Sequence, residues 1–250
     1  MPELAGRKIV ITGGSGDLGQ AMARTCVAQG AQVLLGYHRG RALAESLASE
    51  LGAKCASLDV SDPTRISEFV SAADEALGGI DGWVNAAGIV KPGLLVSQTP
   101  LEVEQVVRVN LLGTLWCCQA AIPVLLKQRP RGNGQRGVIL NLSSVTSQRA
   151  ARGQSAYAAS KGGVEALTRS LAVEYARKGI RVVALAPGAI ESRMLEPTKA
   201  LAGGELLERI PAKRIGSPLD VAEYASFLLS DRSQYVTGCV AHSDGGYVVA

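Results

Sequence analysis

Residues 8–19 read KIVITGGSGDLG, a short aliphatic and β-branched run followed by a glycine-rich turn and the start of a helical pattern. A turn of this kind between a strand and a helix forms an anion site, because backbone N–H groups and the positive end of the helix dipole face the same point. The pattern therefore favours binding of a dinucleotide pyrophosphate over a turn that is merely tight.

The alternation of short apolar runs and longer helical patterns continues to the end of the chain. Strands are expected at residues 8–12, 32–36, 54–58, 82–85, 137–142, 181–186 and 239–243. Helices are expected near residues 18–29, 41–51, 63–77, 102–126, 156–177 and 218–229. Apolar strands separated by helices are typical of a parallel sheet covered on both faces. We therefore expect one Rossmann-type, doubly wound α/β domain of about seven parallel strands over residues 1–250, with ligands beyond the carboxyl ends of the strands.

Composition excludes several classes of protein. The 250 residues are 47% hydrophobic and 19% charged, which suits a large core and excludes disorder. The 26 Lys and Arg against 22 Asp and Glu leave a charge of +4 without a charge run, so neither nucleic acid nor a membrane surface is an expected partner. Five cysteines without a CxxC pattern predict free thiols and no metal site. With no apolar signal segment before Ile9, the cytoplasm is the expected location.

One stretch needs comparison with a membrane span, because residues 109–126 contain no charged residue. Polar residues and a proline interrupt it at Asn110, Thr114, Gln119 and Pro123. The better interpretation is a helix that is apolar nearly all round, with one side on the chain's own sheet and the other on a partner subunit.

Three polar residues near the fifth strand predict proton transfer. Tyr157 and Lys161 are four residues apart at the start of a predicted helix, so they lie on one face. A cation beside a phenol favours phenolate and lowers its pKa from about 10. Ser144 precedes Tyr157 by 13 residues, a loop long enough to return over the head of that helix. Tyr157 then exchanges a proton with a carbonyl or alcohol oxygen that Ser144 orients.

Together these motifs resemble the short-chain dehydrogenase/reductase family, whose fingerprint is TGxxxGxG. Thr12, Gly13 and Gly19 match, but the middle glycine falls on Asp17, which we interpret as the N-cap of a helix starting at Leu18. The predicted phosphate turn comprises Gly13, Ser15, Gly16, Asp17, Leu18 and Gly19.

The resemblance implies roles for further residues. The acidic residue after strand three and its neighbour, Asp59 and Val60, contact the adenine, and the sequence Asn85, Ala86, Ala87, Gly88 supports the fourth strand and the cofactor. The stretch after strand six contacts the nicotinamide through Pro187, Gly188, Ile190 and Ser192. Lys161 also holds the nicotinamide ribose, and Asn110 supports a water-mediated proton relay.

The residues after strand two favour NADP(H) over NAD(H). A site for NAD usually carries an acid there, but this chain has His38, Arg39 and Arg41 and no acid before Glu45. Arginine pairs with a 2′-phosphate, so Arg39, with Arg41 as a second candidate, is the predicted ligand. The alternative, two solvated arginines and NAD(H), stays open.

Within the family, residues 214–218 (RIGSP) and the closing YVTG and DGG stretches resemble the 3-oxoacyl carrier-protein reductase branch. The resemblance implies reduction of a ketone, such as a carrier-bound 3-oxoacyl thioester, to a secondary alcohol, or the reverse. It also implies a substrate lid near residues 189–214. Apolar lid residues are Met194, Leu195, Pro197, Leu201, Leu206 and Leu207.

Two groups of basic residues lie in loops whose side of the sheet follows from the expected topology. Lys127, Arg129, Arg131 and Arg136 precede strand five, so we expect a solvated loop opposite the cofactor cleft. Arg149 and Arg152 lie on the cofactor side, where they could meet an anionic substrate.

The resemblance also implies a homotetramer formed through the two long helices. The alternative function is a catalytically silent NAD(P)-binding sensor or scaffold. Asp17, which replaces a glycine of the fingerprint, is the only residue in the sequence that favours this alternative.

Overall fold

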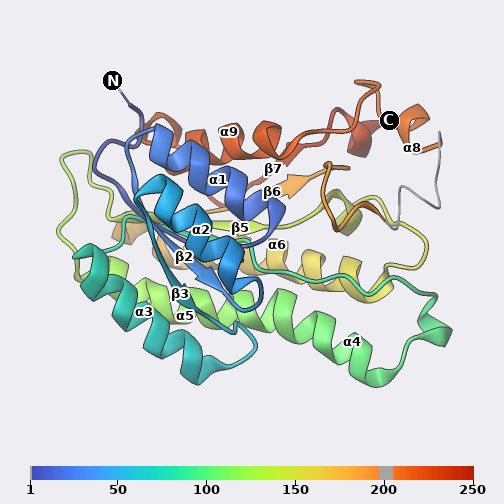
Figure 1. Ribbon diagram of the computed structural model, residues 1–250. Helices are drawn as coiled ribbons and strands as arrows, with labels where there is room; N and C mark the ends of the chain where they lie inside the picture. The colour runs from blue at the N-terminus through green and yellow to red at the C-terminus, as the bar shows by residue number, and fades with distance from the viewer. Residues whose placement is uncertain (1, 197–204) are drawn as a thin grey trace.

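The computed structural model describes residues 2–196 and 205–250. In this part of the chain, seven strands form one parallel sheet in the order β3-β2-β1-β4-β5-β6-β7 (Figure 1). The strands are β1 Lys8–Thr12, β2 Gln32–Tyr37, β3 Lys54–Ser57, β4 Gly82–Asn85, β5 Gly137–Leu142, β6 Ile180–Pro187 and β7 Val240–Ser243. The predicted doubly wound parallel sheet is confirmed, and strand bounds agree to within one or two residues.

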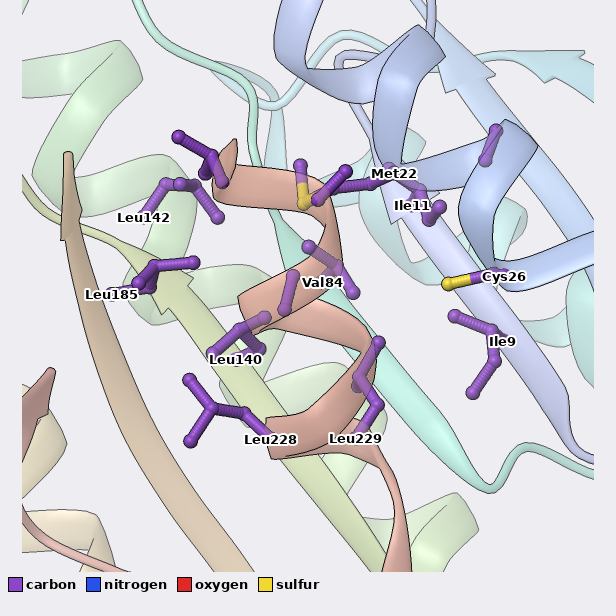
Figure 2. Packing of buried hydrophobic residues seen from close by; sticks show 14 of the residues in the cluster. Ile9, Ile11, Met22, Cys26, Val84, Leu140, Leu142, Leu185, Leu228 and Leu229 are labelled. Atoms are coloured by element: carbon purple, nitrogen blue, oxygen red, sulfur yellow. The ribbon is translucent and has the colours of Figure 1, made fainter. Parts of the chain in front are cut away.

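Helices cover both faces of the sheet. They are α1 Asp17–Ala28, α2 Arg41–Leu51, α3 Pro63–Leu77, α4 Pro100–Val107, α5 Gly113–Lys127, α6 Ser155–Tyr175, α8 Glu205–Glu208 and α9 Pro218–Leu229. Helices α1, α2 and α9 lie on one face, and α3, α5 and α6 lie on the other (Figure 1). Figure 2 shows the first of these layers, where Met22 and Cys26 of α1 and Leu228 and Leu229 of α9 pack over strand residues such as Leu140.

Three helices begin where the sequence supplies an N-cap followed by proline. The Asp62 side chain accepts hydrogen bonds from the first turn of α3. Thr99 with Glu102 forms a capping box before α4, and Ser217 with Asp220 forms another before α9. Such caps satisfy donors that the helix cannot satisfy itself.

Helix α1 begins differently from the prediction. Its N-cap is Gly16 and its first residue is Asp17, whose side chain makes no capping hydrogen bond. The carboxylate instead accepts hydrogen bonds from Arg193, in the loop after β6. The predicted N-cap role of Asp17 is therefore wrong, because a guanidinium from a distant part of the chain binds the carboxylate.

The predicted helix at 102–126 is also divided. A π-helical turn, Arg108–Leu112, joins α4 to α5 and contains Asn110. The combined run Pro100–Lys127 is the one helix in the described residues that is long and apolar enough to cross a membrane, and half of its most apolar window is buried inside the protein. Its buried side packs on the sheet, which is the environment of a core helix.

The basic loop before β5 lies at the amino ends of the strands, as expected, but it is not wholly solvated. Arg131 donates to the Asp81 carboxylate at 2.8 Å, and Arg136 donates to the Lys178 carbonyl at 3.0 Å. Both arginines are half-buried. The solvated interpretation is wrong for these two residues, because they close the loop against neighbouring strand ends.

Candidate active site

The glycine-rich turn is packed against the end of β4. Gly13 has a φ of +68°, and a Cβ there would lie 2.8 Å from the Ala87 Cα. A Cβ on Gly19 would lie 2.3 Å from the Gly13 carbonyl oxygen. Both positions therefore require glycine.

Thr12 ties this turn to the following motif. Its hydroxyl oxygen accepts hydrogen bonds from the backbone N–H groups of Ala86 and Ala87, both at 3.1 Å. Across the described chain, the N–H groups of Asp17 and Leu18 have no acceptor. These donors and the α1 dipole form a site that fits a phosphate.

The end of β2 lies beside the same turn. The Ser15 hydroxyl donates to the Arg39 carbonyl at 2.7 Å. Arg39 is exposed, and its guanidinium has no ion-pair partner in the described residues. Arg41 instead pairs with Glu45 at 2.7 Å, four residues along α2. Arg39 is thus the better placed of the two predicted phosphate ligands.

Asp59, which was expected at the adenine, contacts His38 from the end of β2 and Ser61 from its own loop. His38 Nε2 lies 3.5 Å from Asp59 Oδ2, while Asp59 Oδ1 accepts from the Ser61 N–H and hydroxyl. Burial acts to raise the pKa of Asp59, but the Ser61 hydrogen bonds together with the nearby His38 and Arg108 outweigh it, and the pKa lies below its ordinary value. The neighbouring Val60 is buried.

Asn85 lies in the interior rather than at an open surface. Its side chain accepts from Trp83 Nε1 at 2.8 Å and donates to Asn141 Oδ1 at 2.8 Å. Asn141 in turn donates to the Thr168 hydroxyl at 2.9 Å. The Asn85 side chain therefore supports the strand ends. The sequence interpretation did not single out Asn141.

One cleft of about 1090 Å³, including its open mouth, is lined by the predicted catalytic residues other than Asn110 and by the predicted nicotinamide residues. Its walls come from the phosphate turn, the ends of β4, β5 and β6, and the head of α6. Lining residues that the sequence predicted are Leu18, Ala86, Gly88, Ser144, Tyr157, Lys161, Pro187, Gly188, Ile190 and Ser192. Within the described chain, no cluster of His, Cys, Asp or Glu could hold a metal ion.

Lys161 and Tyr157 lie together at the head of α6. The Lys161 ammonium donates to the Leu142 carbonyl at 2.6 Å and lies 5.8 Å from the centre of the Tyr157 ring. Burial lowers the pKa of Lys161 to about 8. Burial also raises the pKa of Tyr157, an effect that a hydrogen bond with Ser144 partly offsets. The expected lowering of the Tyr157 pKa is therefore wrong for the protein alone, because loss of solvent dominates.

The two serines after β5 have different partners. Ser143 donates to the Glu165 carboxylate at 2.8 Å. Ser144 contacts Tyr157 and lies 3.1 Å from the Thr146 hydroxyl. Since the Ser143 hydroxyl is bound to Glu165, whereas Ser144 lines the cleft with Tyr157, the arrangement favours Ser144 as the substrate-orienting residue.

Asn110 is fully buried in the π-helical turn. Its Oδ1 accepts from the Ile89 N–H at 2.8 Å, and its Nδ2 donates to the Ile89 carbonyl at 2.9 Å and the Ser160 hydroxyl at 3.1 Å. The Asn110 amide therefore links the loop after β4 to α6. A π turn re-aims a residue within a helix, which is why such turns are frequent at functional sites.

The loop after β6 supplies the opposite wall. The Gly188 N–H donates to the Ser243 carbonyl at 3.0 Å, and Ile190 forms a bridge with Gly216. The Ser192 hydroxyl donates back to the Ile190 carbonyl at 3.0 Å. Met194, Leu195 and Leu206 of the predicted lid line the cleft, whereas Pro197 and Leu201 lie outside the described residues.

The carboxyl-terminal turn completes the rim. The Arg149 guanidinium lies 4.5 Å from the centre of the Tyr247 ring and donates to the Tyr247 carbonyl. Both residues line the cleft, but Arg152 does not. The sequence interpretation did not predict this role for Tyr247.

Comparison with known proteins assigns this architecture to a family. A family model described as enoyl-(acyl carrier protein) reductase matches residues 15–248. The chain belongs to the short-chain dehydrogenase/reductase family, and as a member it is an NAD(P)-dependent oxidoreductase acting on carbonyl or alcohol groups.

Individual relatives extend over nearly the whole chain. The 3-oxoacyl-[acyl-carrier-protein] reductase FabG of Thermotoga maritima is 38% identical over 251 residues, covering 98% of this chain and 99% of the relative. Nodulation protein G of Rhizobium sp. (strain N33) is 35% identical, with 98% of each chain covered. The crystal structure of levodione reductase superposes with a TM-score of 0.90 at 35% identity, covering 99% of each chain.

Proposed function

We propose that this protein is an NADPH-dependent reductase that converts a ketone to a secondary alcohol, or the reverse, with Tyr157 as the general acid and base. The observation that carries the proposal is the meeting of Ser144, Tyr157 and Lys161 in one cleft, beside the phosphate turn. The similarity to 3-oxoacyl-[acyl-carrier-protein] reductases supports a carrier-bound 3-oxoacyl thioester as the substrate class.

The raised pKa of Tyr157 suits the reducing direction. It keeps the phenol protonated, so Tyr157 can donate its proton to the carbonyl oxygen of the substrate. Ser144 holds the same oxygen by a hydrogen bond. When bound, NADPH supplies the hydride to the carbonyl carbon.

Lys161 stabilises the phenolate that this proton transfer leaves. With a pKa of about 8 it is mostly charged at neutral pH, and its ammonium lies 5.8 Å from the centre of the ring. Asn110, through Ile89 and Ser160, holds the surrounding backbone in place. Its predicted part in a proton relay remains a proposal that rests on the family resemblance.

The choice of NADP(H) rests on Arg39. Its backbone carbonyl accepts from Ser15 of the phosphate turn, and its exposed side chain has no acid as a partner in the described residues. Arginine binds a 2′-phosphate well, whereas the carboxylate typical of NAD sites would repel it. Equal kcat/KM values for NADPH and NADH would overturn this preference.

We also propose that the protein assembles as a homotetramer in the cytoplasm. Leu115 and Leu126 of α5 and Val173 of α6 are exposed large apolar residues on the two long helices. Their burial against another copy would remove apolar surface from water. Light scattering at micromolar concentration tests the assembly, and a monomeric mass would contradict it.

The reaction is tested by NADPH oxidation across a panel of ketones. The panel contains β-ketoesters, levodione, other diketones, ketosteroids, quinones and 3-oxoacyl thioesters, the last both free and on a carrier protein. We expect the wild-type protein to oxidise NADPH with at least one of these ketones, and Tyr157→Phe to lower that rate by about 100-fold or more. An active Tyr157→Phe variant would contradict the mechanism. Cofactor binding without turnover over the whole panel would favour the sensor or scaffold.

A further inference from the structure

Asp17 and Arg193 are 176 residues apart in the chain but are joined by two kinds of contact. The backbone N–H of Arg193 donates to Asp17 Oδ2 at 2.8 Å, and its Nε donates to Asp17 Oδ1 at 3.1 Å. Arg193 Nη2 also donates to the Ser15 carbonyl at 2.9 Å. The guanidinium is therefore held on the phosphate turn at two separate points.

The charges at this position explain why the contact matters. Asp17 is the first residue of α1, where a carboxylate interacts favourably with the helix dipole but would repel a pyrophosphate. Arg193 binds both carboxylate oxygens and neutralises that charge. With its charge neutralised in this way, Asp17 no longer repels a pyrophosphate bound at the turn.

The guanidinium keeps donors for a ligand. An arginine has five N–H donors, and the contacts of the described chain use only Nε and Nη2. The side chain of Arg193 is 63% exposed, and that of Asp17 is 27% exposed. Free guanidinium donors thus remain on a side chain that is bound to the same turn as the unpaired N–H groups of Asp17 and Leu18.

The neighbours of the pair place it at the edge of the cleft. Leu18, next to Asp17, lines the cleft from the phosphate turn, and Ser192 and Met194, on either side of Arg193, line it from the loop after β6. The Asp17–Arg193 contact therefore bridges the two walls that border the cofactor's phosphate and nicotinamide ends.

We propose that Arg193 is a pyrophosphate ligand and that Asp17 is the residue that positions it. Bidentate binding by a planar guanidinium suits phosphate oxygens. The proposal rests on the NAD(P) class of the enzyme and does not depend on the preference for NADP over NAD.

The test measures dissociation constants for NADPH and NADH by isothermal titration, without turnover. Arg193→Gln is expected to raise both constants by the same factor, about tenfold, because both cofactors contain the pyrophosphate. Arg39→Gln is the matched control, and it should raise the constant for NADPH alone. If the NADP preference is wrong, Arg39→Gln has no effect, while the Arg193→Gln result still decides the present proposal.

The role of Asp17 is tested by a double-mutant cycle. Asp17→Asn should weaken binding of both cofactors about threefold in the wild-type background, because Arg193 loses its anchor. In the Arg193→Gln background it should tighten binding, because it removes a carboxylate charge that nothing then neutralises and that repels the pyrophosphate. Arg24→Gln, which breaks another exposed pair with Glu50, should leave both constants unchanged. Unchanged or tighter binding by Arg193→Gln overturns the proposal, and an equal Asp17→Asn effect in both backgrounds overturns the positioning role.

Discussion

Ser143 donates a 2.8 Å hydrogen bond to the buried carboxylate of Glu165, one helical turn beyond Lys161 on α6. The same carboxylate also accepts from the Ser147 hydroxyl. Ser143 and Ser147 stand on either side of Ser144 in the chain. These hydrogen bonds therefore hold the loop that carries Ser144 against α6, the helix that carries Tyr157 and Lys161.

This arrangement predicts different effects for the two adjacent serines. Ser144→Ala should lower kcat about 100- to 1000-fold, because it removes a donor to the reacting oxygen. Ser143→Ala should lower kcat far less, since its hydroxyl is used by Glu165. Steady-state kinetics at saturating NADPH measure both, and equal losses would reverse the assignment.

Glu165 should matter for stability. Glu165→Leu removes the carboxylate that accepts from the Ser143 and Ser147 hydroxyls and leaves them only the backbone carbonyls of Lys161, at 3.4 Å, and Ser144, at 2.6 Å. The loss should cost about 1 kcal/mol of unfolding free energy. Glu165→Gln keeps an acceptor oxygen and is expected to recover most of the loss. Urea unfolding measures the stability. A Leu variant as stable as wild type would contradict the role.

Asn110 should stabilise the protein through its amide. Asn110→Leu keeps the size but leaves the half-buried Ile89 N–H and carbonyl without hydrogen bonds inside the protein, while the Ser160 hydroxyl still donates to the Tyr157 carbonyl. We expect a loss of about 2 kcal/mol, because both polar groups of the Ile89 backbone lose their partner. Gln119→Leu, at an exposed position of α5, is the control and should change little. Similar melting temperatures for the two variants would count against this prediction.

The buried Lys161 predicts a dependence of stability on pH. Its pKa is about 8 in the folded protein and about 10.4 in the unfolded chain. Between these values the unfolded chain binds the extra proton, so the Lys161 contribution to stability rises with pH, whereas below about pH 8 it is constant. Lys161→Met removes this contribution.

The measurement is the difference in unfolding free energy between wild type and Lys161→Met from pH 7 to 10, without cofactor. Burial raises the pKa of the Cys26, Cys117 and Cys118 thiols, which makes stability fall with pH over part of this range. That effect is common to both proteins and cancels in the difference. A difference that stays flat up to pH 10 would show that Lys161 is not desolvated.

Arg149 should contribute to selection of anionic substrates. It lines the cleft and is held by Tyr247, whereas Arg152 is exposed and lies outside the lining. Arg149→Gln should raise KM for an anionic carrier-bound thioester more than KM for a neutral β-ketoester. Arg152→Gln should change both KM values less than Arg149→Gln changes the KM for the anionic substrate. Equal KM changes for the charged and neutral substrates would remove this role.

Much of the fold and the cleft could be predicted from local patterns. The apolar runs predicted all seven strands, because residues buried on both faces of a parallel sheet must be apolar along their whole length. Ser144, Tyr157 and Lys161 meet in the cleft because strand ends and a four-residue helical spacing are local properties. Asn110 was singled out through the family resemblance, which did not predict the π turn around it.

The tertiary structure decided what depends on distant or buried partners. Asp17 resembled an N-cap in its own neighbourhood, but Arg193 reaches it from far along the chain and binds its carboxylate. The Lys161 spacing suggested a lowered pKa for Tyr157, yet burial raises it. Glu165 received no role from its neighbours in sequence, because its hydrogen-bond partners come from the loop after β5. Local spacing determines which side chains share a face, but loss of solvent and contacts between distant segments exist only once the chain has folded.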